Sequence, residues 1–423
     1  MNRQLIQLFI VTLLLISCKS PLKVTIDRNY ANMYSPGSSR IRPVYTIYHN
    51  SDSSSDMFIK LFPIELLYTQ ANEQGKYLGR VNIEFQLFDI ENDKKGILAD
   101  SGKLQYTFER EGVKQIFIDR IPLKAKIGKA YELRVKATDL IRRDENQKFI
   151  IVDKRSEFSQ QNFMLSNDIH SIPYFAPYVI RNGPFTIFYR NDRYKKIYVS
   201  YYGKESPLPK PTFSLARERQ FFGKPDSMWT LPFKLGLKYL LKYEGIYHFQ
   251  LDTTIDEGLT ILNFGMDFPK IEKAEQLIEP LSYLMVSSEY EKQKAATNKK
   301  LAVDNFWLNK ADGIDRAREL IRIYYNRVYF ANIYFTSFKP GWKTDRGMIY
   351  VIYGPPQHIY RSDSQEKWVY YRKSFSSSIT FIFNYIPSPY ALNNYILERS
   401  ESYDWHWREA VESWKNGKVF MLD

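Results

Sequence analysis

The sequence has a single cysteine, Cys18, and few of the residues that build common catalytic or metal sites. One thiol excludes an intramolecular disulfide framework and a thiolate metal cluster. None of the five histidines has a second histidine four residues away, the spacing of a helical metal site. The motifs G-x-S-x-G, G-x-G-x-x-G and H-E-x-x-H and the P-loop are missing as well. We therefore expect no metal, no cofactor and no catalytic activity.

A long hydrophobic run is also lacking, apart from one at the N-terminus. A weakly basic start at Asn2-Arg3-Gln4 precedes a mostly apolar stretch over residues 5–16. That stretch is too short to span a membrane, which takes about 20 apolar residues, but it has the length of a signal-peptide core. We therefore predict that residues 1–17 are a signal peptide.

The end of this segment, Leu15-Ile16-Ser17-Cys18, resembles a bacterial lipobox. A plain signal peptide with an incidental cysteine is the alternative. We favour lipidation because the only cysteine of the chain falls where the lipid would be attached. Cys18 would carry a diacylglyceryl thioether and an amide-linked acyl chain such as palmitate, and more than one acyl chain gives stable anchoring. We expect a lipoprotein of the outer membrane; the sequence leaves open which face it occupies.

Positive charge exceeds negative charge, with 60 Lys and Arg against 47 Asp and Glu and a formal net charge of +13. Residues 271–423 carry only +3 of this excess, which leaves +10 on residues 1–270, without a block of like charges. A solvated basic face is one interpretation, and attraction to anionic lipid or acidic glycan is the other. Nucleic acid is not an expected partner because the protein is exported.

At roughly 150 residues per domain, 423 residues suggest about three domains. Over residues 18–168, apolar and polar residues alternate, for example at 81–87 and 131–137, which predicts strands with one buried face. Further strands are expected at 44–49 and 57–61, on either side of a serine-rich turn. The stretch from Leu123 to Tyr131 resembles the tyrosine corner of immunoglobulin and fibronectin type III sandwiches.

Residues 169–269 show the same alternation at 197–201 and 247–251. Residues 241–247 repeat the tyrosine-corner pattern, so we expect a second sandwich. The proline-rich stretch 207–211 is predicted to be a stiff loop inside this domain, because strand patterns flank it and proline cannot donate to a central ladder.

After Pro269 the periodicity changes, and residues 270–423 form the third predicted domain. Apolar residues recur at three- and four-residue steps from Ile314 to Phe335, which predicts an amphipathic helix with Asp312 as its N-cap. Residues 281–308 are expected to be mostly helical with a break at 295–298, and residues 405–415 to form a last helix. Strands are predicted at 348–353, 367–372, 379–385 and 395–398. The expected fold is therefore mainly β plus α+β: two tandem immunoglobulin- or fibronectin-like sandwiches, then helices with an antiparallel sheet.

Residues 340–356, Pro-Gly-Trp-Lys-Thr-Asp-Arg-Gly-Met-Ile-Tyr-Val-Ile-Tyr-Gly-Pro-Pro, resemble the signature of the GWxTD-domain family. The helix before them, with Arg-Val-Tyr-Phe-Ala-Asn at 327–332, and the Phe306-Trp307 pair are also similar to that family. The resemblance covers about the last 150 residues. It implies a protein of the bacterial envelope and this domain's fold; it implies no reaction.

The motif residues Gly341, Trp342, Thr344 and Asp345 each suit a structural task. Glycine permits a tight turn, tryptophan is a large apolar anchor, and Thr and Asp side chains can bond nearby backbone N–H groups. We favour this architectural interpretation over catalysis. A competing hypothesis is a small polar cleft lined by Asp345, Arg346 and His358, which would flank the strand predicted at 348–353 and could form an acid–base pair.

Another possible pair, His406 and Glu409, shares one helical face, but packing and a surface ion pair explain it better than a metal site.

Two functions from different classes are compatible with these features. The first is a non-catalytic lipoprotein, anchored through Cys18, that is a scaffold or accessory subunit of an outer-membrane protein assembly. The second is a glycan-binding envelope lipoprotein, because exposed Tyr and Trp can stack on sugar rings.

Overall fold

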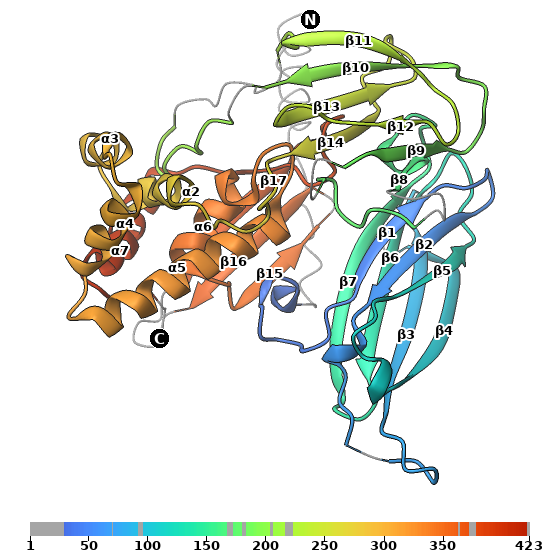
Figure 1. Ribbon diagram of the computed structural model, residues 1–423, viewed down its shortest axis with the longest axis horizontal. Helices are drawn as coiled ribbons and strands as arrows, with labels where there is room; N and C mark the ends of the chain where they lie inside the picture. Colours follow the sequence, from blue (N-terminus) through green and yellow to red (C-terminus); the bar gives the residue numbers. More distant parts are fainter. Residues whose placement is uncertain are drawn as a thin grey trace, which may run out of the picture.

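The computed structural model describes residues 29–69, 71–91, 96–166, 172–179, 183–203, 206–215, 223–362, 364–371 and 378–420. The predicted signal peptide, Cys18 and His170 lie outside these residues. Figure 1 shows a β-rich body at the lower right, a second one at the top and a mixed domain of helices and strands at the left. This arrangement confirms the predicted fold class.

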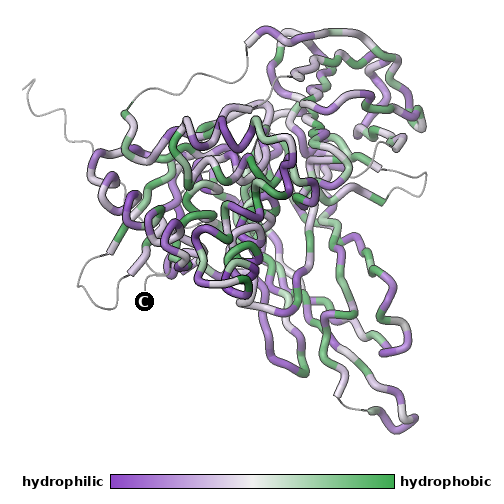
Figure 2. The backbone as a smooth tube through the Cα atoms, turned by 60° about the vertical axis from the view of Figure 1, so that its left-hand side comes forward, coloured by the Kyte–Doolittle hydropathy of each residue, from purple (hydrophilic) through white to green (hydrophobic). Residues whose placement is uncertain are grey.

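The first β-rich body consists of two antiparallel sheets, with strand orders β1-β2-β5 and β4-β3-β6-β7. Between the sheets lies a core of buried aliphatic and aromatic side chains. Hydrophobic and hydrophilic residues alternate along these strands (Figure 2), as expected for sheets with one face in the core. The strands are β1 (Val44–Tyr48), β2 (Ser55–Leu61), β3 (Leu78–Asp89), β4 (Ile97–Glu109), β5 (Phe117–Leu123), β6 (Ala130–Asp139) and β7 (Asp144–Asp153).

The second sandwich repeats this topology strand for strand. Its sheets have the orders β12-β9-β8 and β11-β10-β13-β14, so its strands pair in the same relative order as those of the first sandwich. Because β8 pairs with β9, this domain begins shortly before residue 169. The strands are β8 (Phe163–Ser166), β9 (Phe185–Tyr189), β10 (Lys196–Tyr202), β11 (Ser227–Pro232), β12 (Lys238–Tyr239), β13 (Gly245–Gln250) and β14 (Leu259–Asn263).

Both predicted tyrosine corners are confirmed. The Tyr131 hydroxyl accepts a hydrogen bond from the Lys126 backbone N–H at 2.9 Å. The Tyr247 hydroxyl donates to the Tyr243 carbonyl at 2.9 Å and accepts from the Tyr243 N–H at 3.0 Å. Each tyrosine is buried on the third strand of its four-stranded sheet and fixes the loop before that strand.

The third domain has a four-stranded antiparallel sheet with the order β15-β16-β17-β18, packed against helices. The predicted long helix is confirmed as α5, and the break at 295–298 separates α3 from α4. The helices are α2 (Ala274–Ile278), α3 (Ser287–Ala295), α4 (Lys299–Leu308), α5 (Ile314–Phe335), α6 (Asp345–Tyr353) and α7 (Asp404–Lys415), and the strands are β15 (His358–Arg361), β16 (Gln365–Tyr371), β17 (Ser378–Tyr385) and β18 (Tyr395–Leu397). The 3-10 turns are η1 (Ala31–Tyr34), η2 (Pro63–Glu65), η3 (Arg110–Gly112), η4 (Gln160–Asn162), η5 (Glu279–Leu284), η6 (Gly341–Lys343) and η7 (Glu401–Tyr403).

Two local predictions are wrong. Residues 348–353 form the C-terminal part of helix α6, and the first strand of the sheet is β15 instead. Every residue of α6 is buried, and a short, fully apolar run cannot be assigned to a strand or a helix by periodicity. At the start of α5 the N-cap position is held by Gly313, without a side-chain cap, and not by Asp312.

The N-terminal segment at residues 29–34 belongs to the third domain, although it precedes the first sandwich in the chain. Ala31 and Tyr34 are buried in the core of the third domain. The Tyr30 N–H donates to the Ile359 carbonyl at 2.9 Å, and the Tyr350 hydroxyl donates to the Tyr34 carbonyl at 3.0 Å. The first predicted domain, 18–168, therefore contains a segment that completes the core of the last one.

The predicted proline-rich loop lies between β10 and β11 and also packs on the third domain. Leu208 and Phe213 contact the core of that domain. The Ser400 N–H donates to the carbonyl of the fully buried Thr212 at 3.2 Å. The second sandwich therefore touches the third domain through this long loop as well as through its strands. Among the described residues, no helix has the length and apolar character needed to cross a membrane.

Candidate functional site

The two glycines of the motif allow α5, η6 and α6 to approach one another closely. An alanine Cβ at Gly341 would lie 2.0 Å from the carbonyl oxygen of Ala331 in α5. At Gly347 it would lie 1.9 Å from the carbonyl oxygen of Gly341. Both obstacles are backbone atoms, which cannot move aside as a flexible side chain can. These positions require glycine because of packing.

Thr344 and Trp342 hold the same turn in place. The Thr344 hydroxyl donates to the Gly341 carbonyl at 2.7 Å and accepts from the Gly347 N–H at 3.0 Å, so it caps α6. The Trp342 ring is buried against Tyr283, whose hydroxyl donates to the Trp342 carbonyl at 2.7 Å. Each of these residues has the structural task expected for it.

Asp345 and Arg346 are buried in two separate ion pairs. The Asp345 carboxylate accepts from Arg399 Nη2 at 2.7 Å and from the Leu397 N–H at 2.7 Å. Arg346 Nη1 lies 3.2 Å from a carboxylate oxygen of the fully buried Glu366. Burial alone would raise the pKa of Glu366, but Arg346 and Arg361 outweigh burial and hold that pKa below its usual value.

His358 lies on β15, where its ring stacks on Tyr360 and meets the edge of Tyr371. The strand that was expected to connect it with Asp345 and Arg346 is a helix. An acid–base role for Asp345 or Arg346 would require that its buried ion pair be broken. The cleft predicted around these three residues stays a prediction.

A large cavity lies instead at the junction of all three domains. Its volume is about 750 Å³, enough for a peptide segment or a small ligand. Its walls come from β1, from residues 172–178 beside β8 and β14, and from the end of α5 with the loop before β18. We call this cavity the interdomain cleft.

Among the described residues, four exposed aliphatic side chains line the interdomain cleft, and together they come from all three domains. Their exposed fractions are 56% for Ile116, 41% for Ile172, 43% for Ile333 and 55% for Leu392. Aromatic rings add to them: the lining includes Tyr45, Tyr48, Phe163, Tyr174, Phe175, Tyr178, Tyr334 and Tyr390. An apolar surface gathered in one concave site is typical of binding sites.

The motif supports one wall of this cleft. The Thr336 hydroxyl accepts from the Gly341 N–H at 3.1 Å, and Thr336 itself lines the cleft. Arg346 Nη2 donates to the Asn393 carbonyl at 3.2 Å. Asn393, a lining residue, in turn donates to the Tyr334 carbonyl at 3.1 Å. The GWxTD motif therefore positions cleft residues without facing the cleft itself.

The described charged residues at the interdomain cleft are positive. None of the described residues that line it is Asp or Glu, whereas Lys60 does line it. The Lys60 ammonium lies 4.8 Å from the centre of the Phe175 ring, and burial lowers the pKa of this lysine. Beside the cleft, the Lys148 ammonium lies 6.0 Å from the centre of the Tyr334 ring, and burial lowers its pKa to about 8. In the described part of the chain, no carboxylate pairs with either lysine.

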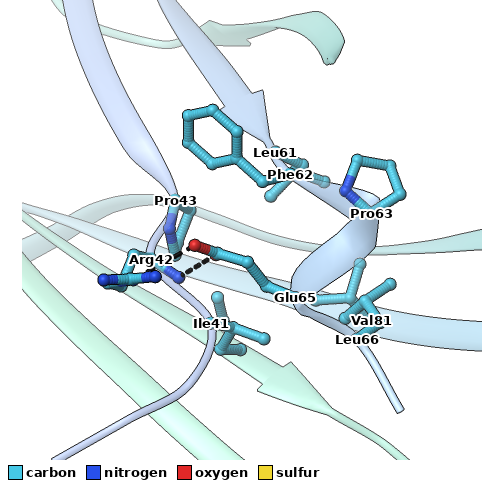
Figure 3. A pocket seen from close by; sticks show the side chains of 10 residues that line it. Ile41, Arg42, Pro43, Leu61, Phe62, Pro63, Glu65, Leu66 and Val81 are labelled. Carbon is cyan, nitrogen blue, oxygen red and sulfur yellow. Dashed lines mark hydrogen bonds and ion pairs between the residues drawn. The ribbon is translucent and has the colours of Figure 1, made fainter. Parts of the chain in front are cut away.

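Two other hollows are smaller than the interdomain cleft. One, of about 10 Å³, lies next to the start of β1 and can hold no more than a water molecule (Figure 3). The other, of about 540 Å³, lies between η5 and α7 and is lined in part by Phe213, Val286 and Trp405. Over the described ranges, no three His, Cys, Asp or Glu side chains are placed to hold a metal ion.

The sequence predicted none of the cleft residues. They come from distant segments, and their meeting depends on how the three domains pack. One local signal was available: Ile333 stands outside the apolar stripe of α5, which includes Val328, Ala331 and Phe335. An aliphatic residue off the buried face of an amphipathic helix suggests a contact other than the domain core.

Residues 245–416 match the family model of the GWxTD domain. The match begins at β13 of the second sandwich, where Ile246 packs in one cluster with Phe338 of the third domain. No curated protein sequence matches the chain. One similar solved structure is a Bacteroides fragilis protein described as a beta-galactosidase, with 10% identity and a TM-score of 0.19 over 36% of this chain and 18% of that chain. Residues 245–416 of this chain therefore form a GWxTD domain.

Proposed function

We propose that this chain is a non-catalytic outer-membrane lipoprotein that acts as a scaffold or accessory subunit of an envelope protein assembly. The observation that carries this proposal is the interdomain cleft with its four exposed aliphatic residues. Such a surface is costly to leave in water and is typical of a site that a partner covers. A partner seated there would contact all three domains at once.

The chemistry of the site supports binding over catalysis. The paired carboxylates of a hydrolase have no counterpart among the described lining residues of the cleft. The carboxylate of Asp345, the acidic residue of the motif, accepts hydrogen bonds from Arg399 and from the Leu397 N–H. The motif residues that we expected to be architectural have structural partners.

The membrane anchor rests on Cys18 and the lipobox-like residues before it. Metabolic labelling with an alkyne analogue of palmitate tests it directly. We expect label on the wild-type chain and none on Cys18→Ser, together with loss of the variant from the membrane fraction. Equal labelling of both chains would contradict lipidation at Cys18.

Recovery of a partner from membranes tests the scaffold role. After in-cell cross-linking and mild-detergent purification, we expect the wild-type chain to retain a defined outer-membrane protein and Leu392→Glu to lose it. A charge at this exposed lining position disturbs the cleft without entering a core. Leu235→Glu, in the turn before β12 and 73% exposed, is the matched control. A monodisperse chain without a partner, or equal recovery by all three chains, would refute the proposal.

Glycan binding is a second candidate, and the aromatic rings of the cleft favour it. Tyr45, Tyr174 and Tyr334 are among eight aromatic residues that line the cleft, and rings of this kind can stack on sugars. Lys60 would suit an acidic glycan. A glycan array separates the candidates: binding of acidic oligosaccharides that Tyr334→Ala abolishes would favour the glycan.

A further inference from the structure

Strand β1 is an edge strand whose free side faces the interdomain cleft. It pairs on one side with β2, and all five of its residues line the cleft. In an antiparallel ladder, alternate residues direct both backbone groups toward the partner strand, and the residues between them direct theirs away. The His49 N–H, just after β1, bonds to the Gln161 carbonyl of η4 at 2.8 Å, on the side away from β2. By the same alternation, Tyr45 and Ile47 direct their N–H and C=O groups away from β2.

This open stretch of backbone is short and closed at both ends. At one end, η4 occupies the edge through the bond between His49 and Gln161. At the other end stands Pro43, which has no N–H to donate. Glu65 fixes Arg42, the residue before Pro43: its carboxylate accepts from the Arg42 backbone N–H at 2.7 Å and from Arg42 Nε at 3.1 Å (Figure 3). Within the described residues, no hydrogen bond to the backbone of Tyr45 or Ile47 is found outside the strand ladder.

Lys60 lies within reach of a strand added at this edge. It is the cross-strand partner of Val44, so both side chains stand on the same face of the sheet. A residue opposite Val44 on an added strand would lie about 10 Å from Lys60, two strand spacings away. A lysine and an acidic side chain can together bridge that distance. Because Lys60 has no carboxylate partner in the described structure, an incoming acidic residue would supply one.

We propose that the interdomain cleft binds an extended segment of a partner protein, which pairs as a strand with Tyr45 and Ile47 of β1 and directs an acidic side chain to Lys60. This inference deepens the proposed function and rests on it. Backbone pairing supplies affinity, and alternate side chains of the segment pack on the aliphatic residues of the cleft. The positive charge of Lys60 and Lys148, with no acidic lining residue in the described structure, selects an acidic segment.

Selection from a random heptapeptide library displayed on phage tests the inference. The target is the mature chain carrying Cys18→Ser, which lacks only the proposed lipid. We expect enriched peptides to alternate aliphatic and polar residues and to contain Asp or Glu. Synthetic copies should bind the target, and Lys60→Met should weaken binding about tenfold or more. Lys196→Met, at an exposed position of β10 outside the cleft, should leave the Kd unchanged.

N-methylation of the peptide separates strand pairing from side-chain binding without any change to the protein. Methyl groups on one set of alternate residues should weaken binding about tenfold or more, whereas methyl groups on the other set should have little effect. Lys60→Met should keep the wild-type melting temperature or raise it, because this lysine has no ion-pair partner to leave unpaired in the described structure.

Several outcomes would overturn the inference. They are the absence of any enriched peptide, enriched peptides without acidic residues, a Kd unaffected by Lys60→Met, and binding that no N-methyl pattern weakens. Binding of polygalacturonate in place of peptides would also overturn it, in favour of the glycan. If the membrane partner is recovered and Leu392→Glu loses it, while selected peptides fail to displace it, the proposed function stands and strand addition is wrong.

Discussion

Gly347 shows how strongly a single residue of the motif is determined by its neighbours. Adding a Cβ there would place it 1.9 Å from the Gly341 carbonyl oxygen. We predict that Gly347→Ala lowers the free energy of unfolding of the third domain by about 3 kcal/mol or more, because backbone must move to relieve the overlap. Urea denaturation followed by tryptophan fluorescence measures this change, since six of the seven tryptophans lie in the third domain.

Gly37→Ala is the control for this substitution. No atom lies within 4 Å of a Cβ at Gly37, and its φ is not in the positive range. We expect its unfolding transition to match that of the wild type. If Gly347→Ala were equally harmless, the close approach of η6 and α6 could not be the reason for the glycine.

Two buried histidines predict how stability depends on pH. His49 and His248 are almost fully buried, and burial lowers the pKa of each from 6.5 to about 4. Below pH 6.5 the unfolded chain takes up protons that the folded chain does not. The free energy of unfolding should therefore fall between pH 6.5 and about 4, by roughly 3 kcal/mol for each histidine, and the effect is absent above pH 6.5.

A comparison of two chains isolates the histidine effect from that of the carboxylates. We expect His248→Gln to lose less stability than the wild type when the pH is lowered from 7.5 to 5.0 in equilibrium urea titrations. Glutamine can retain a bond of the kind that His248 makes to the Thr260 hydroxyl or the Asp256 carbonyl. An identical loss in both chains would mean that His248 is not the titrating group.

The chemistry of the motif residues predicted the structural roles of several of them, but it did not predict which distant residues form ion pairs with Asp345 and Arg346. Thr344 was expected to fix a turn and Trp342 to be an anchor, because these tendencies are local. Arg399, the partner of Asp345, lies 54 residues away, and Glu366, the partner of Arg346, lies 20 residues away. Such pairs depend on how β16 and β18 reach the helix, which no local pattern contains.

Among the elements, strong periodicity was predictive and short apolar runs were not. The stripe from Ile314 to Phe335 has the length and period of a helix, and α5 has those bounds. Helix α6 has only nine residues, and all of them are buried, so it shows no polar face that would reveal its period. The alternation in the sandwiches was informative because one face of most strands is in water.

The N-terminal segment η1 is an element of the third domain, and its removal should destabilise that domain. A chain that begins at Gly37 loses the buried Ala31 and Tyr34, and with Tyr34 the hydroxyl that donates to Glu366 at 3.0 Å. We predict that this truncation lowers the free energy of unfolding of the third domain by about 4 kcal/mol or more. Hydrogen exchange measured by mass spectrometry should show faster exchange in β15, β16 and α6.

The matched control is a chain that begins at Asn29, which retains η1 and its contacts. Its exchange should equal that of the full chain in every domain. Outside β7, whose Phe149 ring contacts that of Tyr30, the first sandwich should exchange equally in both truncated chains, because its own core does not include Ala31 or Tyr34. Faster exchange confined to the first sandwich, or unchanged exchange in β15 and α6 after removal of η1, would contradict the prediction.

At the scale of the whole molecule, Tyr390 connects the second sandwich with the third domain. Its hydroxyl lies 3.2 Å from the Tyr202 hydroxyl, and its ring centre lies 4.7 Å from that of His248. We predict that Tyr390→Ala loosens this contact and changes the shape of the interdomain cleft, which Tyr390 lines. Small-angle X-ray scattering should show a larger maximum dimension than for the wild type.

Tyr371→Ala serves as the control, because Tyr371 is 45% exposed on β16 and does not line the cleft. Its scattering profile should match that of the wild type. A Tyr390→Ala profile identical to the wild type would contradict the prediction and show that the other contacts between the second sandwich and the third domain suffice, such as those of Phe338 and of the loop at residues 206–215.

The order of the three domains could be predicted from the sequence, whereas their packing could not. The change of periodicity after Pro269 separates the sandwiches from the third domain, and the repeated tyrosine-corner pattern indicates that there are two sandwiches. The cleft needs β1, residues 172–178 and the loop before β18 to meet, and these segments carry no shared pattern. The same limit applies to residues 29–34, which are far from β15 in sequence although the Tyr30 N–H donates to the Ile359 carbonyl of that strand.

The position of η1 also constrains the sequence of events during biosynthesis. Residues near 30 leave the ribosome well before the helices and sheet that enclose them. Tyr34 therefore lacks its pocket until the third domain has been synthesised. The third domain closes around a segment that precedes the first sandwich, so a chain that stalls before this domain is made would leave the ring of Tyr34 exposed to water.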